Sequence, residues 1–256
     1  MTCTCHTTVN GLIIHSLQLS AEEDRRGQVF VLIHGLGMSS RYMMPTACLL
    51  APHGIVHVPD LPGFGKSGKP SHTLSIAELS DFLHEWLAAR NISSPVLIGN
   101  SLGAQVIADY AARYPEGLRC AVLVAPTSDP GFRSVPAQFV KLLWDLPGEP
   151  AGLYWIGLRD FARAGWSRML ETLQSALVHP IAEVMSRIRC PVLLVRGARD
   201  PIVSQAWLEE AAHLIPGSVL VVIPKAAHAV NFDAPASLVA EVMNFLALHV
   251  NSGVSQ

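Results

Sequence analysis

Patterns typical of buried strands alternate with patterns typical of amphipathic helices along most of the chain. The strand-like runs are short and rich in Val, Ile and Leu, as expected for strands buried on both faces. They cover residues 29–33, 55–58, 96–98, 121–124, 192–195 and 219–223. Helical patterns cover residues 76–89, 102–113, 205–214 and 237–248. This alternation implies right-handed crossovers, and it predicts an α/β fold with a mostly parallel central sheet flanked by helices.

One long stretch interrupts the alternation. Residues 127–187 contain no convincing strand pattern, and their leucines and aromatic residues stand at helical spacing. We therefore predict a core of residues 1–126 and 188–256 with a helical cap of residues 127–187. Insertions after parallel strands lie over the crevice where such folds bind ligands, so Trp144 and Trp155 are predicted to contact substrate. The alternative is an extra helical layer with a structural role, because most aromatic stripes are core.

The composition argues against several classes of function. The 256 residues include 18 basic and 20 acidic ones, a net charge of −2 without a block of like charges, which disfavours nucleic-acid binding. No apolar stretch has the length of a membrane span, and no basic segment followed by an apolar one indicates a secretory signal. The five cysteines are scattered and odd in number, which predicts free thiols and a cytoplasmic location.

The first residues contain a small group of metal-binding side chain types. Cys3, Cys5 and His6 are closely spaced, but structural metal sites usually need wider spacing and a second ligand pair. We therefore expect a frayed terminus without a metal. The following Asn10-Gly11 pair predicts a hairpin turn, because both residue types tolerate a positive φ.

The segment Gly99-Asn100-Ser101-Leu102-Gly103 lies between a strand pattern and a helix pattern. A G-x-S-x-G sequence in this setting is typical of a nucleophile elbow, where a serine is exposed on a strained turn. Glycines fit two residues to either side because the turn is crowded there. The serine would lie at a helix N-terminus, beside N–H groups that can stabilise an oxyanion. Ser101 is the predicted nucleophile, and an ordinary tight turn is the alternative.

A serine nucleophile needs a base, and the base needs an acid that orients it. His228 and Asp200 each follow one of the last two strand patterns, so both are expected at the same sheet edge as Ser101. We predict His228 as the base and Asp200 as the acid. Asp129, which follows an earlier strand pattern, is a rival acid. Asp200 is favoured because its loop directly precedes the strand–helix unit that carries His228.

A second loop at this edge begins at His34. The backbone N–H of Leu36 is the predicted partner of the Leu102 N–H in an oxyanion hole. Gly35 lets the backbone approach a reacting carbonyl closely, and we predict that Gly35 and Asn100 contact substrate. His34 itself is expected to support the loop by hydrogen bonding rather than to take part in catalysis.

Five ordered motifs together resemble the α/β-hydrolase fold family of serine hydrolases. They are His34-Gly35-Leu36-Gly37, the segment from Asp60 to Ser67, the elbow at Ser101, the Gly-x-x-Asp turn at Asp200, and His228. The resemblance implies the fold, the chain order Ser, Asp, His and catalysis without a cofactor or metal. It also implies that Asp60 and the glycines after it shape a loop beside the cleft, without a catalytic role.

Serine at the elbow narrows the reaction. Similar haloalkane dehalogenases and epoxide hydrolases use aspartate there, whereas serine implies an acyl-enzyme from an ester, thioester or amide. The chain is similar to carbon–carbon bond hydrolases in its Gly-Asn-Ser elbow, but it has Ala229 where they carry tryptophan. It is also similar to the carboxylesterases that cleave the methyl ester of pimeloyl carrier protein. Arg159, Arg163 and Arg168 fit carrier binding, or else a solvated helix face.

The sequence therefore predicts a carboxylesterase-like serine hydrolase acting on a small or medium acyl ester. A carbon–carbon bond hydrolase of a diketone-type substrate is one alternative, and a non-catalytic ligand-binding member of the fold is another. The expected partner is a small-molecule ester, with neither nucleic acid nor a membrane span. The motifs do not specify the acyl chain, the leaving group or the oligomeric state.

Overall fold

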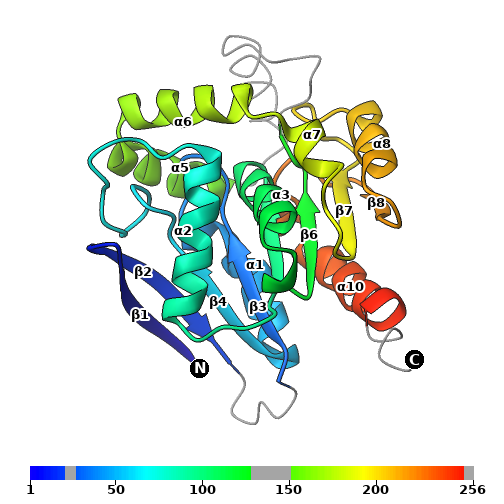
Figure 1. The fold of residues 1–256 in the computed structure, drawn as a ribbon, viewed down its shortest axis with the longest axis horizontal. Helices are drawn as coiled ribbons and strands as arrows, with labels where there is room; N and C mark the ends of the chain where they lie inside the picture. Colours follow the sequence, from blue (N-terminus) through cyan, green and yellow to red (C-terminus); the bar gives the residue numbers. More distant parts are fainter. Residues whose placement is uncertain (21–26, 128–150, 251–256) are drawn as a thin grey trace.

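A single mixed sheet forms the centre of the molecule (Figure 1). The structure, a computed structural model, describes residues 1–20, 27–127 and 151–250. Within these residues the strand order is β1-β2-β4-β3-β5-β6-β7-β8, and only the β1–β2 and β2–β4 pairs are antiparallel. The α/β class is therefore confirmed. The strands are β1 Thr2–Val9, β2 Leu12–Leu19, β3 Val29–Ile33, β4 Ile55–Pro59, β5 Val96–Asn100, β6 Cys120–Val124, β7 Val192–Gly197 and β8 Val219–Ile223.

Side-chain alternation along the strands builds a core on each face of the sheet. In β3, Val31 and Ile33 pack into the core that receives α2, α3, α7 and α8, while Phe30 and Leu32 pack into the core that receives α1 and α10. The helices are α1 Ser40–Leu50, α2 Ile76–Ala89, α3 Leu102–Arg113, α5 Ala151–Ala164, α6 Trp166–Val178, α7 Ile181–Met185, α8 Gln205–Leu214, α9 Val230–Asp233 and α10 Pro235–Phe245. Short 3₁₀ turns cover Ala51–His53 and Pro115–Gly117, and a π turn covers Leu246–Val250.

The N-terminal segment is ordered, so the expectation of a frayed terminus is wrong. Strand β1 pairs with β2 from Thr2 opposite Leu19 to Val9 opposite Leu12. The turn between them has φ of 48° at Asn10 and 77° at Gly11, as the predicted hairpin requires. The pairing extends to the exposed residues at the start of β1, because a ladder of main-chain hydrogen bonds orders them.

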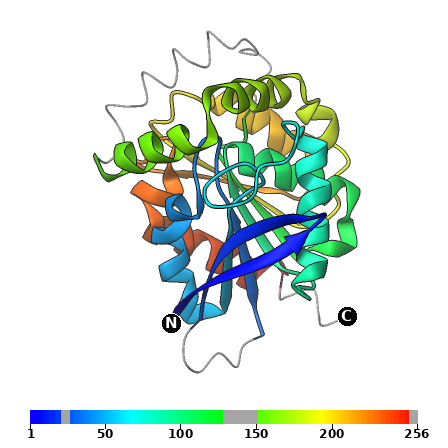
Figure 2. The same cartoon turned by 90° about the vertical axis from the view of Figure 1, so that its left-hand side faces the viewer.

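Helices α5 and α6 lie across the end of the sheet toward which β6 points (Figure 1), and Figure 2 shows the same layer from the side. Met169 of α6 packs on Gly37, whose φ is 72°, and Arg168 packs on Gly63, whose φ is 85°. The Arg168 guanidinium also donates to the Pro70 carbonyl at 3.1 Å. We call α5 and α6 the upper layer. It lies within residues 127–187, and the cap predicted for that segment stays a prediction.

No helix among the described residues combines the length and the apolar character that a bilayer crossing needs.

Candidate active site

Ser101 occupies a sharp turn between β5 and α3. Its φ is 57° and its ψ is −116°, a combination that a residue with a side chain rarely adopts. The two glycines of the motif make this turn possible. A Cβ at Gly99 would lie 2.5 Å from the Gly103 carbonyl, and a Cβ at Gly103 would lie 2.3 Å from the Ile33 carbonyl oxygen. The strained turn therefore requires glycine, which has no side chain, at both of these positions.

Asp200 and His228 form a buried pair at the ends of β7 and β8. The Nδ1 atom of His228 lies 2.9 Å from Oδ2 of Asp200. The other carboxylate oxygen, Oδ1, accepts hydrogen bonds from the N–H groups of Ile202 at 2.7 Å and Val203 at 3.0 Å. Burial raises the pKa of Asp200, but the charge and hydrogen bond of His228 and the two N–H donors outweigh it. The net pKa is lowered, so this carboxylate is ionised at neutral pH.

The loops that carry this pair are held together by main-chain contacts. Gly197 ends β7 so close to the next loop that a Cβ would lie 2.1 Å from the Ala227 carbonyl oxygen. The Arg199 N–H donates to the Ala226 carbonyl at 2.9 Å. The buried Arg196 guanidinium donates to the carbonyl of Asp200 at 2.7 Å, and its Nε donates to another carbonyl of the same loop. The acid and the imidazole are therefore fixed by the backbone as well as by their own hydrogen bond.

Asn100 connects the Ser101 turn to the histidine loop. Its buried side chain donates from Nδ2 to the His228 carbonyl at 3.1 Å. Its Oδ1 accepts from the Tyr42 hydroxyl at 2.8 Å. On the other side of the turn, a Cβ at Gly35 would lie 3.5 Å from the Ser101 Cβ. The structure thus gathers the Ser101 turn, the histidine loop and the loop after β3 at one edge of the sheet.

The start of α3 and the loop after β3 both lie beside Ser101. Leu102 is the first residue of α3, and the N–H groups of a helix's first turn have no acceptor within the helix. The loop that carries Leu36 is supported by His34, as expected. His34 Nδ1 donates to the Gly35 carbonyl at 2.8 Å, and its Nε2 accepts from the Leu61 N–H at 2.9 Å. These roles require the neutral imidazole, and burial lowers the pKa of His34 accordingly.

Asp60 organises the loop next to this site. Its Oδ2 lies 2.9 Å from Nδ1 of His15 and accepts from the Lys66 N–H at 2.8 Å, while Oδ1 accepts from the Ser40 N–H at 2.6 Å. Burial raises the pKa of Asp60, but these hydrogen bonds outweigh it and lower the pKa to about 2. These contacts join the loop to β2 and α1, which fits the loop-shaping role that the resemblance implies.

The prediction that Trp155 contacts substrate is not supported by its position. Its side chain is 75% exposed on α5. The face of α5 that turns toward the protein carries Leu153 and Asp160 instead, one on each side of Gly157. Helical spacing alone does not say which face is buried, and here the aromatic residue points outward. Trp144 and Asp129 lie outside the described residues.

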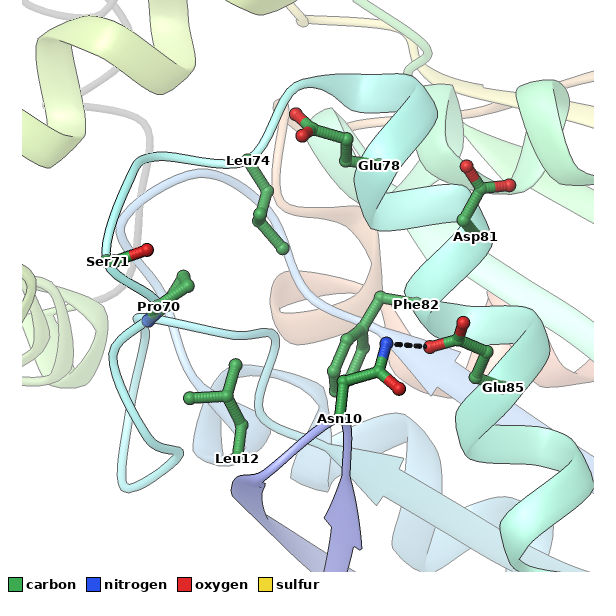
Figure 3. A pocket seen from close by; sticks show the side chains of 9 residues that line it. All are labelled: Asn10, Leu12, Pro70, Ser71, Leu74, Glu78, Asp81, Phe82 and Glu85. Atoms are coloured by element: carbon green, nitrogen blue, oxygen red, sulfur yellow. Dashed lines mark hydrogen bonds between the residues drawn. The ribbon is translucent and has the colours of Figure 1, made fainter.

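A cavity of about 430 Å³ lies away from Ser101, between α2, the β1–β2 turn and the loop before α2 (Figure 3). Its acidic residues already have partners. Glu78 accepts from the Ser75 N–H, and Asp81 is paired with Arg113. Glu85 accepts from Asn10, as Figure 3 shows. Because these carboxylates are satisfied by the protein, the cavity gives no sign of a ligand.

Several residues of the site were not predicted from the sequence. Tyr42 and Asn231 belong to a buried network in which Asn231 Nδ2 donates to the Tyr42 carbonyl at 3.1 Å. Asp233 accepts from the Ala227 N–H at 2.8 Å, one residue before His228. Arg196, whose guanidinium donates to the Asp200 carbonyl, is the fourth residue that was not predicted. Local sequence carries no signal for the Tyr42–Asn231 contact, whereas Asp233 could have been suspected from its closeness to His228.

The arrangement suits nucleophilic catalysis by a serine. It places a strained hydroxyl-bearing turn, a carboxylate-oriented imidazole and the first turn of α3 at one edge of the sheet. Among the described residues, no group of three or more His, Cys, Asp or Glu side chains is arranged to hold a metal ion.

Comparisons with known proteins agree with this geometry. The family model described as "Alpha/beta hydrolase family" matches residues 30–242. The 2-(acetamidomethylene)succinate hydrolase of Mesorhizobium japonicum is 26% identical over 262 aligned positions, covering 91% of this chain and 93% of its own. A solved structure of E-2-(acetamidomethylene)succinate hydrolase has a TM-score of 0.81 at 21% identity, covering 96% of this chain and 100% of its own. A solved structure of a thermophilic esterase from Thermogutta terrifontis has a TM-score of 0.78 at 19% identity, covering 96% of this chain and 98% of its own. At these identities the solved structures establish the fold alone.

Proposed function

The chain belongs to the alpha/beta hydrolase family, and from this premise we propose that it is a carboxylesterase-like serine hydrolase that works through an acyl-enzyme on Ser101. The observation that carries the proposal is the 2.9 Å contact between Asp200 and His228, held at the same sheet edge as the Ser101 turn. A ligand-binding protein has no need for a carboxylate-oriented imidazole beside a strained serine. This combination is the requirement for activating a hydroxyl group.

In the proposed reaction, Ser101 attacks the substrate carbonyl while Nε2 of His228 accepts the hydroxyl proton. The N–H groups of Leu36 and Leu102 hold the oxyanion, and Asp200 keeps the imidazole in the required tautomer. His228 then protonates the leaving alcohol, which departs and leaves the acyl group on Ser101. A water molecule gives its proton to His228 and attacks the acyl-enzyme, which releases the acid and restores the serine.

The proposed substrate is an ester or thioester with a small or medium acyl group. We propose that residues 127–187 form a cap over it, in line with the contacts of the upper layer with Gly37 and Gly63. Gly35 would line the acyl side, because a Cβ there would lie 3.5 Å from the Ser101 Cβ. The position of Asn100 does not support the predicted substrate contact, because its side chain is buried and bonded to Tyr42 and the His228 carbonyl. The described cysteines carry free thiols, which supports a cytoplasmic location.

An amide-type substrate is a second candidate. The relative from Mesorhizobium japonicum, which matches 91% of this chain, is named for a substrate with an acetamido group and two carboxylates. An amide carbonyl reacts through the same acyl-enzyme, so the site residues keep their roles. Comparing a short p-nitrophenyl ester with the matching p-nitroanilide would separate the two candidates.

The deciding experiment compares wild type with Ser101→Ala on p-nitrophenyl acetate and butyrate. We expect the variant to fold normally and to lose at least about 10³-fold in kcat, because only the nucleophile is removed. Unchanged turnover would exclude Ser101 as the nucleophile.

A fluorophosphonate probe adds an independent readout. Wild type should be labelled at one site per chain and Ser101→Ala should not be labelled. The p-nitrophenyl esters separate the two cases further. A non-catalytic binding protein would release no more than one equivalent of p-nitrophenol per chain, whereas an esterase releases many. Stoichiometric release would therefore favour the ligand-binding alternative.

A further inference from the structure

Two thiols share one face of the edge strand β1. Cys3 and Cys5 stand at alternate positions of the strand, and alternate residues of a strand point to the same side, while Met1 directly precedes the strand. Met1 is 83% exposed, Cys3 is exposed and Cys5 is half-buried. Figure 2 shows the β1–β2 hairpin on the near side of the molecule, and β1 is at the opposite end of the strand order from β8. These thiols are therefore accessible and separate from the site around Ser101.

The two thiols are spaced for a shared metal ion. The Sγ atoms of Cys3 and Cys5 lie 4.0 Å apart. With metal–sulfur bonds of about 2.3 Å, two sulfurs at this distance subtend roughly 120° at a bridging ion. A disulfide needs sulfurs about 2.05 Å apart, so the pair would have to close by roughly 2 Å within a regular strand. A bridging ion fits the existing spacing, and a disulfide does not.

One fixed positive charge lies beside the two thiols. The Arg90 guanidinium lies 3.8 Å from the Cys5 Sγ and donates to the Gln18 Oε1 atom at 2.8 Å. Gln18 stands opposite Cys3 on β2; its Oε1 accepts from the Cys5 thiol at 3.8 Å and its carbonyl accepts from the Cys3 thiol at 3.7 Å. The guanidinium charge is therefore fixed beside the sulfurs. His6 points to the other face of β1, where its ring contacts His15, so it is not a ligand of this pair.

We propose that Cys3 and Cys5 form a binding site for a soft monovalent metal ion, and specifically for Cu(I). Thiolates and thioethers select Cu(I), and a site with two or three sulfur ligands satisfies it. Binding releases the two thiol protons to solvent, and the resulting two thiolates with one Cu(I) carry a single negative charge, which Arg90 balances. Met1, which directly precedes the strand and is 83% exposed, carries a further soft sulfur atom. A zinc ion would need four ligands from protein groups, more than this face offers.

The test is a competition for Cu(I). Reduced, full-length protein is titrated without oxygen into the coloured Cu(I) complex of bicinchoninate. We expect each chain to take up one Cu(I) ion, with Cys3→Ser and Cys5→Ser each weakening the affinity by at least about 100-fold, since two linked ligands bind far more tightly than one. X-ray absorption of the loaded protein should report sulfur neighbours only.

Cys48→Ser is the matched control, because Cys48 is also an exposed thiol but has no second thiol beside it. It should keep the wild-type affinity, and circular dichroism should show that all three variants fold alike. The proposal is overturned if the reduced protein takes no Cu(I) from the complex, if Cys3→Ser binds as tightly as wild type, or if Cys48→Ser weakens binding equally. This test is independent of the proposed hydrolase activity, because Ser101→Ala should bind Cu(I) normally.

Discussion

Replacing Asp200 with asparagine tests the proposed role of the acid with little change of shape. The asparagine carbonyl can keep the hydrogen bonds that Oδ1 now accepts from the N–H groups of Ile202 and Val203. Its NH₂ group then faces Nδ1 of His228 across 2.9 Å. Two donors cannot share that contact, so the imidazole must place its proton on Nε2, the atom that has to accept the proton of Ser101.

The expected loss follows from this change of tautomer. In the Ser-His-Asp template, an asparagine at the acid position lowers kcat by about 10⁴-fold. At 1.36 kcal/mol for each factor of ten, this corresponds to about 5 kcal/mol of lost transition-state stabilisation. KM should change far less, because Asp200 is 4% exposed behind the imidazole and does not line the substrate.

The assay is the steady-state hydrolysis of p-nitrophenyl butyrate, with thermal unfolding to show that the variants fold. Asp233→Asn is the matched control, since Asp233 accepts from the Ala227 N–H instead of from the imidazole, and it should cost less than about tenfold. Asp129→Asn is measured beside them. If Asp200→Asn stays within tenfold of wild type while Asp129→Asn abolishes turnover, Asp200 is not the acid.

The remaining predictions concern packing, pH and the upper layer. Gly103→Ala should lower the free energy of unfolding by about 3 kcal/mol, because its Cβ would lie 2.3 Å from the Ile33 carbonyl, whereas Gly152→Ala, with its nearest atom at 3.9 Å, should be neutral or slightly stabilising in urea unfolding. The pKa of Asp60 is lowered to about 2 from 3.8, so it contributes about 2 kcal/mol of stability above pH 4 that is lost as the pH falls toward 2. Asp60→Asn should remove that part of the pH dependence of unfolding, and an unchanged slope would contradict it. Trp155→Ala should leave KM for p-nitrophenyl butyrate within twofold of wild type, because the side chain is 75% exposed; a tenfold rise would place it at the substrate.

The sequence predicts the sheet well because buried parallel strands leave a strong local signal. The runs that became β3, β6, β7 and β8 match the observed strands to within a few residues. Helix α1 was not predicted, and the proline at position 45 weakens its helical signal. In the structure Pro45 stands in the middle of that helix, and packing against β3 and β4 offsets the missing hydrogen bond.

The candidate site was predictable where a motif fixes both residue type and position, as for Ser101, Asp200 and His228. It was not predictable where long-range contacts decide. The Tyr42 hydroxyl reaches Asn100 across 58 residues of sequence, and no local pattern records such a pairing. The orientation of α5 could not be predicted for the same reason, because long-range contacts decide which face of this helix meets the core.

The packing of α6 on two glycines restricts which helical segments can be exchanged between this protein and its relatives. Met169 and Arg168 fill the space that a side chain at Gly37 or Gly63 would occupy, and both glycines have a positive φ. A helical segment transplanted from a relative will seat only when its side chains fit these two hollows. Engineers who wish to exchange the helices of the upper layer should therefore move the segments around residues 37 and 63 together with them, as one module.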